Sequence, residues 1–215
     1  DLFYYISFDK QNAIEVIKDN GNHHSSIKLN GEAIDLAVNE KSVFVLLPKE
    51  KSIDVYNILQ GNFTRITGKG DAKIKKPVGM VMNPDGNLMV LEESGVLLTF
   101  SPEGNVLKST PLNGTVSPVS LQTDMAGNLY VLDDKLNAAL KFLPDGKPLN
   151  NTRLYADASK PDDRKGNIGS FYIDPLGYAW LWNKSMNELQ AFTWSDKPIK
   201  IFSAGEKDGM NFSKA

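Results

Sequence analysis

Short apolar runs alternate with polar turns along the whole chain of 215 residues. The runs are rich in Val, Leu, Ile, Phe and Tyr and are bounded by Gly, Asn, Asp and Pro, which is the pattern of β-strands joined by tight turns. A unit made of an apolar strand, a polar turn and a second strand recurs about every 45 residues. Its copies start near Tyr4, Val43, Leu88, Leu129 and Tyr178. A period in this range with several short strands per unit is typical of a β-propeller.

Each complete unit is predicted to hold four strands, called a to d in chain order. The complete units cover about residues 32–70, 71–112, 113–160 and 161–204. A first unit, about residues 1–31, has strands b, c and d but no strand a, and residues 205–215 resemble the lead-in to a further strand a. We therefore predict a single all-β domain over residues 1–215, with about five four-stranded antiparallel blades, that is part of a longer chain.

Two of the a–b hairpins carry a family resemblance. Residues 77–91 read PVGMVMNPDGNLMVL and residues 118–133 read PVSLQTDMAGNLYVLD. Both resemble the NHL repeat, with its Pro and Gly before the turn, an Asp-x-x-Gly-Asn type of turn and an apolar strand after it. The resemblance extends over nearly the whole chain and implies a six-bladed propeller, of the kind that includes gluconolactonase-like enzymes. It does not imply one activity, because NHL propellers serve as enzymes, sensors and binding platforms.

Composition narrows the classes of partner. The formal net charge is −2, which argues against a nucleic-acid partner because affinity for phosphates comes from clustered Lys and Arg. The apolar run Val43–Leu47 is far too short to span a membrane, so no transmembrane segment is predicted. The chain has no cysteine, which is compatible with an extracytoplasmic bacterial protein, and we take that localisation as a prediction.

The loops between strands b and c carry the candidate functional side chains. These loops occupy equivalent places in the repeat, so their polar groups are expected to form a ring on one face of the propeller. The ligand-face candidates are Asp9, Glu50, Glu92, Glu93, Asp133, Asp134, Trp182 and Asn183. Carboxylate and amide oxygens suit calcium, so Glu92, Asp133 and Asn183 are candidate metal ligands. Gluconolactonase-like propellers resemble this arrangement, since their carboxylate and amide ligands come from separate blades. The alternative is that all of these residues lie on solvated hairpin loops.

Two features argue against an enzyme. Acidic pairs follow strand b in only two of the five units, and no histidine lies near them. The two histidines, His23 and His24, are adjacent, so in a strand they point to opposite faces and are expected to be solvent-facing. Trp180 and Trp182 share one face of a strand, where they would either pack between blades or stack on sugar rings.

The leading functional hypothesis is a non-catalytic propeller module of a larger extracytoplasmic bacterial protein. It would bind a protein or carbohydrate partner through loops on one face and would need no cofactor. The alternative is a metal-dependent hydrolase or lactonase with a calcium ion in the central channel. A third hypothesis, a cytoplasmic NHL module that binds RNA or protein, rests on a lysine-rich stretch at residues 69–76 that holds no aromatic residue for base stacking.

Overall fold

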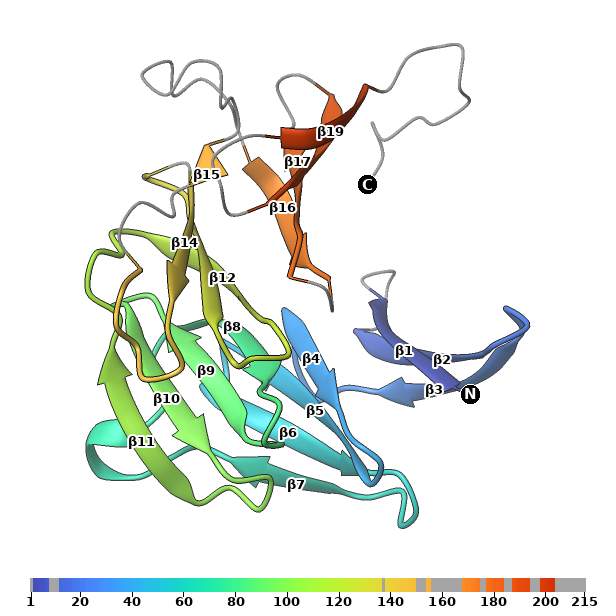
Figure 1. The fold of residues 1–215 in the computed structure, drawn as a ribbon. Helices are drawn as coiled ribbons and strands as arrows, with labels where there is room; N and C mark the ends of the chain where they lie inside the picture. Colours follow the sequence, from blue (N-terminus) through green and yellow to red (C-terminus); the bar gives the residue numbers. More distant parts are fainter. Residues whose placement is uncertain are drawn as a thin grey trace. The chain divides into compact units, whose positions relative to one another are not determined.

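The structure, a computed structural model, describes residues 2–7, 12–136, 138–149, 154–155, 168–174, 177–183, 187–193 and 198–203 (Figure 1). Within these residues the chain forms five antiparallel sheets and one short 3-10 helix, η1 (Gly70–Ala72). No helix of the described part is long and apolar enough to cross a membrane.

Each sheet is built from consecutive strands. The first sheet contains β1 (Leu2–Ser7), β2 (Ala13–Lys18) and β3 (His23–Lys28). The second contains β4 (Asp35–Val38), β5 (Ser42–Leu47), β6 (Ser52–Asn57) and β7 (Phe63–Ile66). The third contains β8 (Pro77–Met82), β9 (Leu88–Glu92), β10 (Val96–Phe100) and β11 (Val106–Pro111). The fourth contains β12 (Pro118–Thr123), β13 (Leu129–Asp133), β14 (Ala138–Phe142) and β15 (Leu154–Tyr155). The fifth contains β16 (Ile168–Ile173), β17 (Ala179–Asn183), β18 (Glu188–Phe192) and β19 (Pro198–Ser203).

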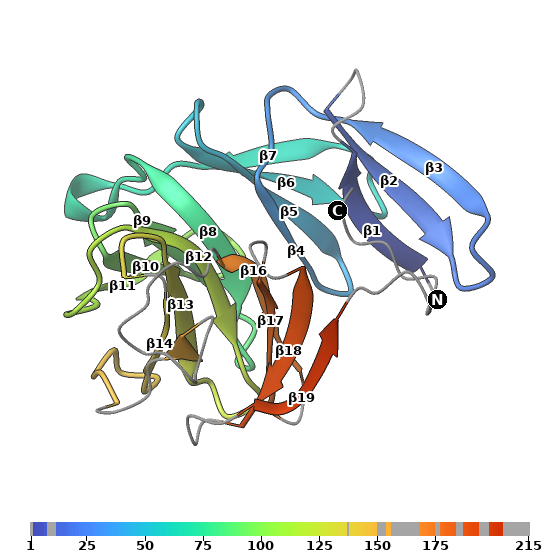
Figure 2. The same cartoon turned by 90° about the horizontal axis from the view of Figure 1, so that it is seen from above.

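These sheets confirm the predicted all-β fold of four-stranded antiparallel blades. Among the described residues the first sheet has three strands, in the order β1-β2-β3 (Figure 2). The chain divides into two compact units, Asp1–Ser109 and Thr110–Ala215, and each is described by itself. The single domain, the exact unit boundaries and the ring of six blades stay predictions.

The core lies between neighbouring sheets, because strand b of each sheet is apolar on both faces. In the compact unit Asp1–Ser109, Val43, Val45 and Leu47 of β5 pack with Ile14 of β2 on one side. On the other side Phe44 and Leu46 pack with residues of the third sheet that include Met80, Leu88 and Phe100. Both views show β4 beside β8, the inner strands of these two sheets (Figures 1 and 2). A strand buried on both faces needs apolar residues at every position, which explains the continuous apolar runs of strand b.

The second unit has the same type of core. Tyr130, Leu132 and Ala139 of the fourth sheet pack with Phe171, Ile173, Leu181 and Phe192 of the fifth. The two units thus bury the strand-b positions in the same way, as expected of a repeat whose neighbours complete each other's core.

Strand a of the third, fourth and fifth sheets, which is β8, β12 and β16, has a shift in its pairing register near its start. The register between strands a and b shifts between Pro77 and Gly79, between Pro118 and Ser120, and again between Ile168 and Ser170. One extra residue on strand a, a β-bulge, accounts for each shift. The bulge lies where the chain enters a new sheet.

Two turn glycines offer a matched test of packing between sheets. Gly86 and Gly104 both have positive φ, 80° and 89°. A Cβ on Gly86 would meet nothing within 4 Å, whereas a Cβ on Gly104 would lie 2.8 Å from Cγ1 of Ile66, in the neighbouring sheet. Each Gly→Ala change is expected to cost about 1–2 kcal/mol through the left-handed backbone. Gly104→Ala is expected to cost about 1 kcal/mol more through overpacking. Urea unfolding of both variants measures the difference, and equal losses would contradict this view of the contact.

Candidate functional site

Two of the predicted metal ligands hold the backbone that leads into strand a. Glu92 ends β9 and is only 5% exposed. Its Oε2 accepts hydrogen bonds from the backbone N–H of Lys76 at 2.6 Å and of Lys75 at 3.3 Å, and Oε1 accepts from Lys75 at 3.1 Å. The carboxylate therefore joins the end of strand b to the segment that begins the same sheet. We call this arrangement the strand-end clamp.

The clamp recurs in the fourth sheet. Asp133 ends β13 and is fully buried. Its Oδ2 accepts from the N–H of Val116 at 2.6 Å and of Ser117 at 2.9 Å, and its Oδ1 accepts from Leu136 at 3.1 Å. The donors lie 16 and 17 residues before the acid in both sheets. Glu92 and Asp133 are buried, and a buried carboxylate that accepts several backbone N–H bonds is satisfied without an ion.

The sequence placed these acids in a ring of ligands, and the structure shows that each has a role inside its own sheet. Asn183 ends β17 at the equivalent place, where its backbone pairs with Ile168 and Glu188. Glu92 belongs to the first unit, whereas Asp133 and Asn183 belong to the second. Within the described residues no group of three or more Asp, Glu or His side chains is arranged to hold an ion. The metal site drawn from these three residues stays a prediction.

The second sheet has no acid at the end of its strand b, β5. The strand-end position there is Leu47, which is buried in the apolar core. The side chain of Glu50, three residues later, folds back to Gly31, which is 16 residues before Leu47. A Cβ on Gly31 would lie 2.6 Å from Cδ and from Oε1 of Glu50, so a larger residue there would displace this carboxyl group. Oε2 of Glu50 is buried and has no hydrogen-bond partner among the described residues. Glu50 therefore lies near the segment that enters the second sheet but does not clamp it as Glu92 and Asp133 do.

The residues next to the clamp acids are the exposed ones. Glu93 is 58% exposed in its side chain and forms an ion pair of 2.9 Å with Nζ of Lys76. Asp134 is exposed too, and its backbone N–H bonds to the carbonyl oxygen of Ser117. Trp182 is half-buried in β17, opposite Ser170 and Leu189. Asp9 lies outside the described residues.

The acids of the a–b turns act as turn formers, as the sequence predicts. Asp124 accepts hydrogen bonds from the N–H of Ala126 and Asn128, both at 2.9 Å, and from the hydroxyl of Tyr130 at 2.7 Å. Burial opposes ionisation of Asp124, but the bonds from Asn128, Tyr130 and Ala126 outweigh it and lower the pKa of the carboxyl. Burial, together with the hydrogen bond from its hydroxyl to Asp124, raises the pKa of Tyr130.

The fifth sheet repeats this turn with a different aromatic residue. Asp174 accepts from the N–H of Tyr178 at 2.9 Å and from Nε1 of Trp180 at 3.1 Å. Trp180 therefore takes the place of Tyr130, with its polar end bonded to the turn acid.

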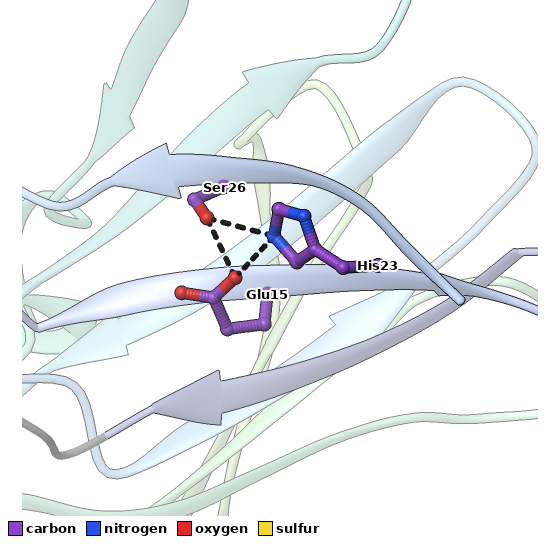
Figure 3. Close-up of polar contacts among 3 residues, drawn as sticks. All are labelled: Glu15, His23 and Ser26. Atoms are coloured by element: carbon purple, nitrogen blue, oxygen red, sulfur yellow. Dashed lines mark hydrogen bonds and ion pairs between the residues drawn. The ribbon is translucent and has the colours of Figure 1, made fainter. Parts of the chain in front are cut away.

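A polar cluster that the sequence did not reveal lies on the first sheet (Figure 3). Glu15 of β2 and Ser26 of β3 are cross-strand partners, and Ser26 Oγ donates to Glu15 Oε2 at 2.6 Å. His23 Nε2 lies 2.8 Å from the same carboxylate oxygen and 3.0 Å from Ser26 Oγ. The hydrogen bond from Ser26, followed by that from His23, lowers the pKa of Glu15. One ring nitrogen faces both partners, whereas a Ser-His-acid relay uses the two nitrogens separately, so the geometry does not form a catalytic triad.

Asp35 is a second group that the sequence analysis missed. It begins β4, is half-buried, and accepts from the N–H of Met80 in β8 at 2.8 Å and from its neighbour Leu36 at 2.9 Å. It thereby links the inner strands of two neighbouring sheets. Burial raises the pKa of Asp35 to about 6, against the lowering effect of the two backbone bonds. A comparison of the repeats could have singled out Asp35, because the equivalent positions in the other sheets hold glycine or serine: Gly79, Ser120 and Ser170.

The clamp predicts that alanine substitutions of two adjacent glutamates have different effects on stability. Glu92→Ala removes the carboxylate that accepts from the backbone N–H groups of Lys75 and Lys76, and it is expected to cost about 2–3 kcal/mol of unfolding free energy, because hydrogen bonds to a charged group are stronger than neutral ones. Glu93→Ala, its neighbour, removes only an exposed ion pair and is expected to leave stability within experimental error. Urea unfolding at pH 7 measures both. Equal effects would show that Glu92 does not hold the backbone.

Asp35 predicts a pH dependence. Because its folded pKa is raised from the usual 3.8 to about 6, it favours folding while protonated, and this contribution is lost as pH rises through that range. Asp35→Asn keeps the acceptor for Met80 but cannot ionise. The variant is expected to gain stability relative to the native chain between pH 4 and pH 7, measured by urea midpoints. A difference that is constant with pH would contradict the raised pKa.

Comparison with known proteins identifies the fold. No protein-family model and no curated protein matches the sequence. A catalytically inactive virginiamycin B lyase from Staphylococcus aureus, solved with quinupristin, matches with a TM-score of 0.68, 13% identity and coverage of 94% of this chain and 74% of the lyase. A protein of unknown function from Bacteroides caccae matches with a TM-score of 0.67, 16% identity and coverage of 94% and 72%. A streptogramin B lyase matches with a TM-score of 0.67, 11% identity and coverage of 94% of this chain and 72% of the lyase.

These neighbours are β-propellers of the six-bladed type, so they support the propeller fold. At this level of identity the likeness concerns the fold alone. The specific assignment to NHL repeats stays a prediction.

Proposed function

We propose that this chain is a non-catalytic propeller module of an extracytoplasmic bacterial protein, and that it binds a protein or carbohydrate partner through the loops that follow strand b. The observation that carries the proposal is the strand-end clamp. The sequence predicts Glu92 and Asp133 as metal ligands, but their carboxylate oxygens accept hydrogen bonds from backbone N–H groups. A scaffold needs such bonds, whereas a metal ion would have to displace them.

The clamp also favours these loops as a binding surface. It fixes the last residue of strand b, and the next residue, Glu93 or Asp134, extends into solvent. Each of these has a backbone N–H bonded to the lead-in segment, to Lys76 and Ser117 respectively. A loop whose backbone is already held by hydrogen bonds loses little backbone entropy when it binds, which supports partner recognition at this end of the sheets.

A metal-dependent hydrolase or lactonase is the second candidate. It is favoured by the acids and amide at equivalent strand ends, and by the enzymes among the structural neighbours. A lyase of the neighbours' type has less support. One neighbour is catalytically inactive after replacement of a histidine by alanine. In this chain both histidines lie on β3, and His23 is bonded to Glu15 and Ser26.

A charge reversal tests the proposed binding surface. Glu93 and Asp85 are exposed acids at opposite ends of the third sheet. Glu93→Lys is expected to weaken binding to a ligand selected from glycan and peptide arrays by about tenfold or more, while Asp85→Lys leaves it unchanged. Titration by biolayer interferometry, with and without EDTA, measures both. Equal effects of the two variants would overturn the assignment to the loops after strand b.

A melting experiment separates the two candidates. A ligand that binds only the folded state raises the melting temperature by mass action. The binding-module proposal expects the same melting temperature in calcium, in other divalent ions and in EDTA. An increase with one ion that Asp133→Asn abolishes, together with lactone hydrolysis that requires this ion, would favour the hydrolase.

A further inference from the structure

The connection from the second sheet to the third departs from the repeat. Ten residues, 67–76, join β7 to β8 through η1 (Figure 1), whereas six residues join β3 to β4, at 29–34, and six join β11 to β12, at 112–117. The longer connection holds four lysines and one aspartate, and the two shorter ones together hold a single charged residue, Glu32. Extra residues in one copy of a repeat lie in loops, often on a binding face. We call residues 67–76 the lysine loop.

The backbone of the lysine loop closes on itself. The N–H of Ile74 donates to the carbonyl oxygen of Thr67 at 2.9 Å, which joins the two ends of the loop. Gly68 has a φ of 72°, and a Cβ there would lie 2.0 Å from the carbonyl oxygen of Ala72, so the chain needs glycine for this close approach. A loop that is already closed loses little backbone entropy when it binds a partner.

Burial decides which side chains the lysine loop displays. Ala72 and Ile74 pack in the core between the second and third sheets and are 6% and 0% exposed. Lys73 and Lys75 are exposed. Lys73 has an extended backbone, with φ −70° and ψ 133°, and side chains two residues apart in an extended segment share a face. Because Ile74 points into the core between them, Lys73 and Lys75 both point outward.

Most of the positive charge of the lysine loop has no partner among the described residues. Lys76 forms its ion pair with Glu93 at 2.9 Å. No ion pair joins Lys69, Lys73 or Lys75 to another described residue. The chain as a whole has a formal net charge of −2, so this loop is a local concentration of positive charge on an acidic protein. Such a surface attracts a negatively charged partner.

We propose that the lysine loop binds an extended acidic peptide segment of a partner protein, with Asp or Glu at alternate positions. Residues two apart in an extended chain are separated by about 6.6 Å, so alternate carboxylates of the peptide match the spacing of Lys73 and Lys75. The loop holds no aromatic residue, whereas nucleic-acid bases and sugar rings bind by stacking on aromatic rings. This observation favours a peptide. The surface precedes strand a, so the proposal goes beyond binding by the loops that follow strand b.

A charge reversal in the loop tests the surface. The probe is a short labelled peptide in which Glu and Thr alternate, titrated by fluorescence anisotropy. Lys73→Glu combined with Lys75→Glu is expected to weaken its binding about tenfold or more, because two attractive pairs become repulsive. The control combines Lys41→Glu with Lys108→Glu, which makes the same change in net charge at exposed lysines outside the loop, and is expected to bind within about twofold of the native chain. Equal losses in the two variants, or no binding of the native chain at millimolar peptide, would overturn the proposal.

A pair of glycines tests the shape of the loop without a change of charge. Gly68→Ala places a Cβ against the carbonyl oxygen of Ala72 and must open the loop, so it is expected to weaken peptide binding about fivefold. Gly70→Ala is the matched control, since Gly70 also has positive φ, 56°, but a Cβ there meets nothing within 4 Å. It is expected to bind within about twofold of the native chain. The same titration measures both, and equal binding by the two variants would contradict a preformed surface.

Two further titrations separate this proposal from its neighbours. Polygalacturonate, a polymer of sugar acids, is expected to bind more weakly than the peptide at equal charge, and tighter binding would overturn the peptide in favour of a carbohydrate. Glu93→Lys is expected to weaken a ligand of the loops that follow strand b but not this peptide, because it frees Lys76 from its ion pair. Failure of the lysine loop to bind and failure of those loops to bind are therefore distinguishable.

Discussion

A buried carboxylate at the end of strand b needs hydrogen-bond donors, and the backbone that enters the same sheet supplies them; this pairing organises the structure. Where the chain leaves one sheet and begins the next, it has no ladder partner for two or three residues. A carboxylate at the end of strand b supplies the acceptors, from Glu92 in the third sheet and Asp133 in the fourth. The bond links two segments 16 and 17 residues apart, so it closes each a–b hairpin at the end opposite its turn. The apolar layers between sheets can then form on a fixed frame.

The same constraint explains why acids recur at positions that suggest a metal site. Sequence alone shows only that oxygen ligands are repeated, and the repeat of a structural bond gives the same signal as the repeat of a ligand. The second sheet differs, because its strand-end residue is the apolar Leu47 and the nearby carboxyl group of Glu50 packs against Gly31. The second sheet thus keeps a carboxyl group near the entering segment without the backbone hydrogen bonds that Glu92 and Asp133 accept.

The fold was predictable because its signals are local and repeated. Strands such as Val96–Phe100 and Ala13–Lys18 follow from apolar runs between turn residues, and Asp124 acts in its turn as the sequence indicates. The candidate site was predictable only as a set of equivalent positions. Whether Glu92 faces an ion or a backbone N–H depends on a segment 16 residues earlier, which strand periodicity does not place. The partnership of Glu15 with His23 depends on the bulge between Val16 and Ile17, which shifts the register of β3.

Proline at the start of strand a completes the account of these donors. Pro77 and Pro118 follow directly after the residues whose N–H groups the clamp binds, and each lies at the bulge. Proline has no N–H, so the third position of the entering segment makes no demand on the single carboxylate. The acid and the proline are therefore matched in their hydrogen-bonding capacity. A substitution of the proline would add a donor that the acid cannot serve, and exchange of the acid would be tolerated only together with a new route for the entering chain.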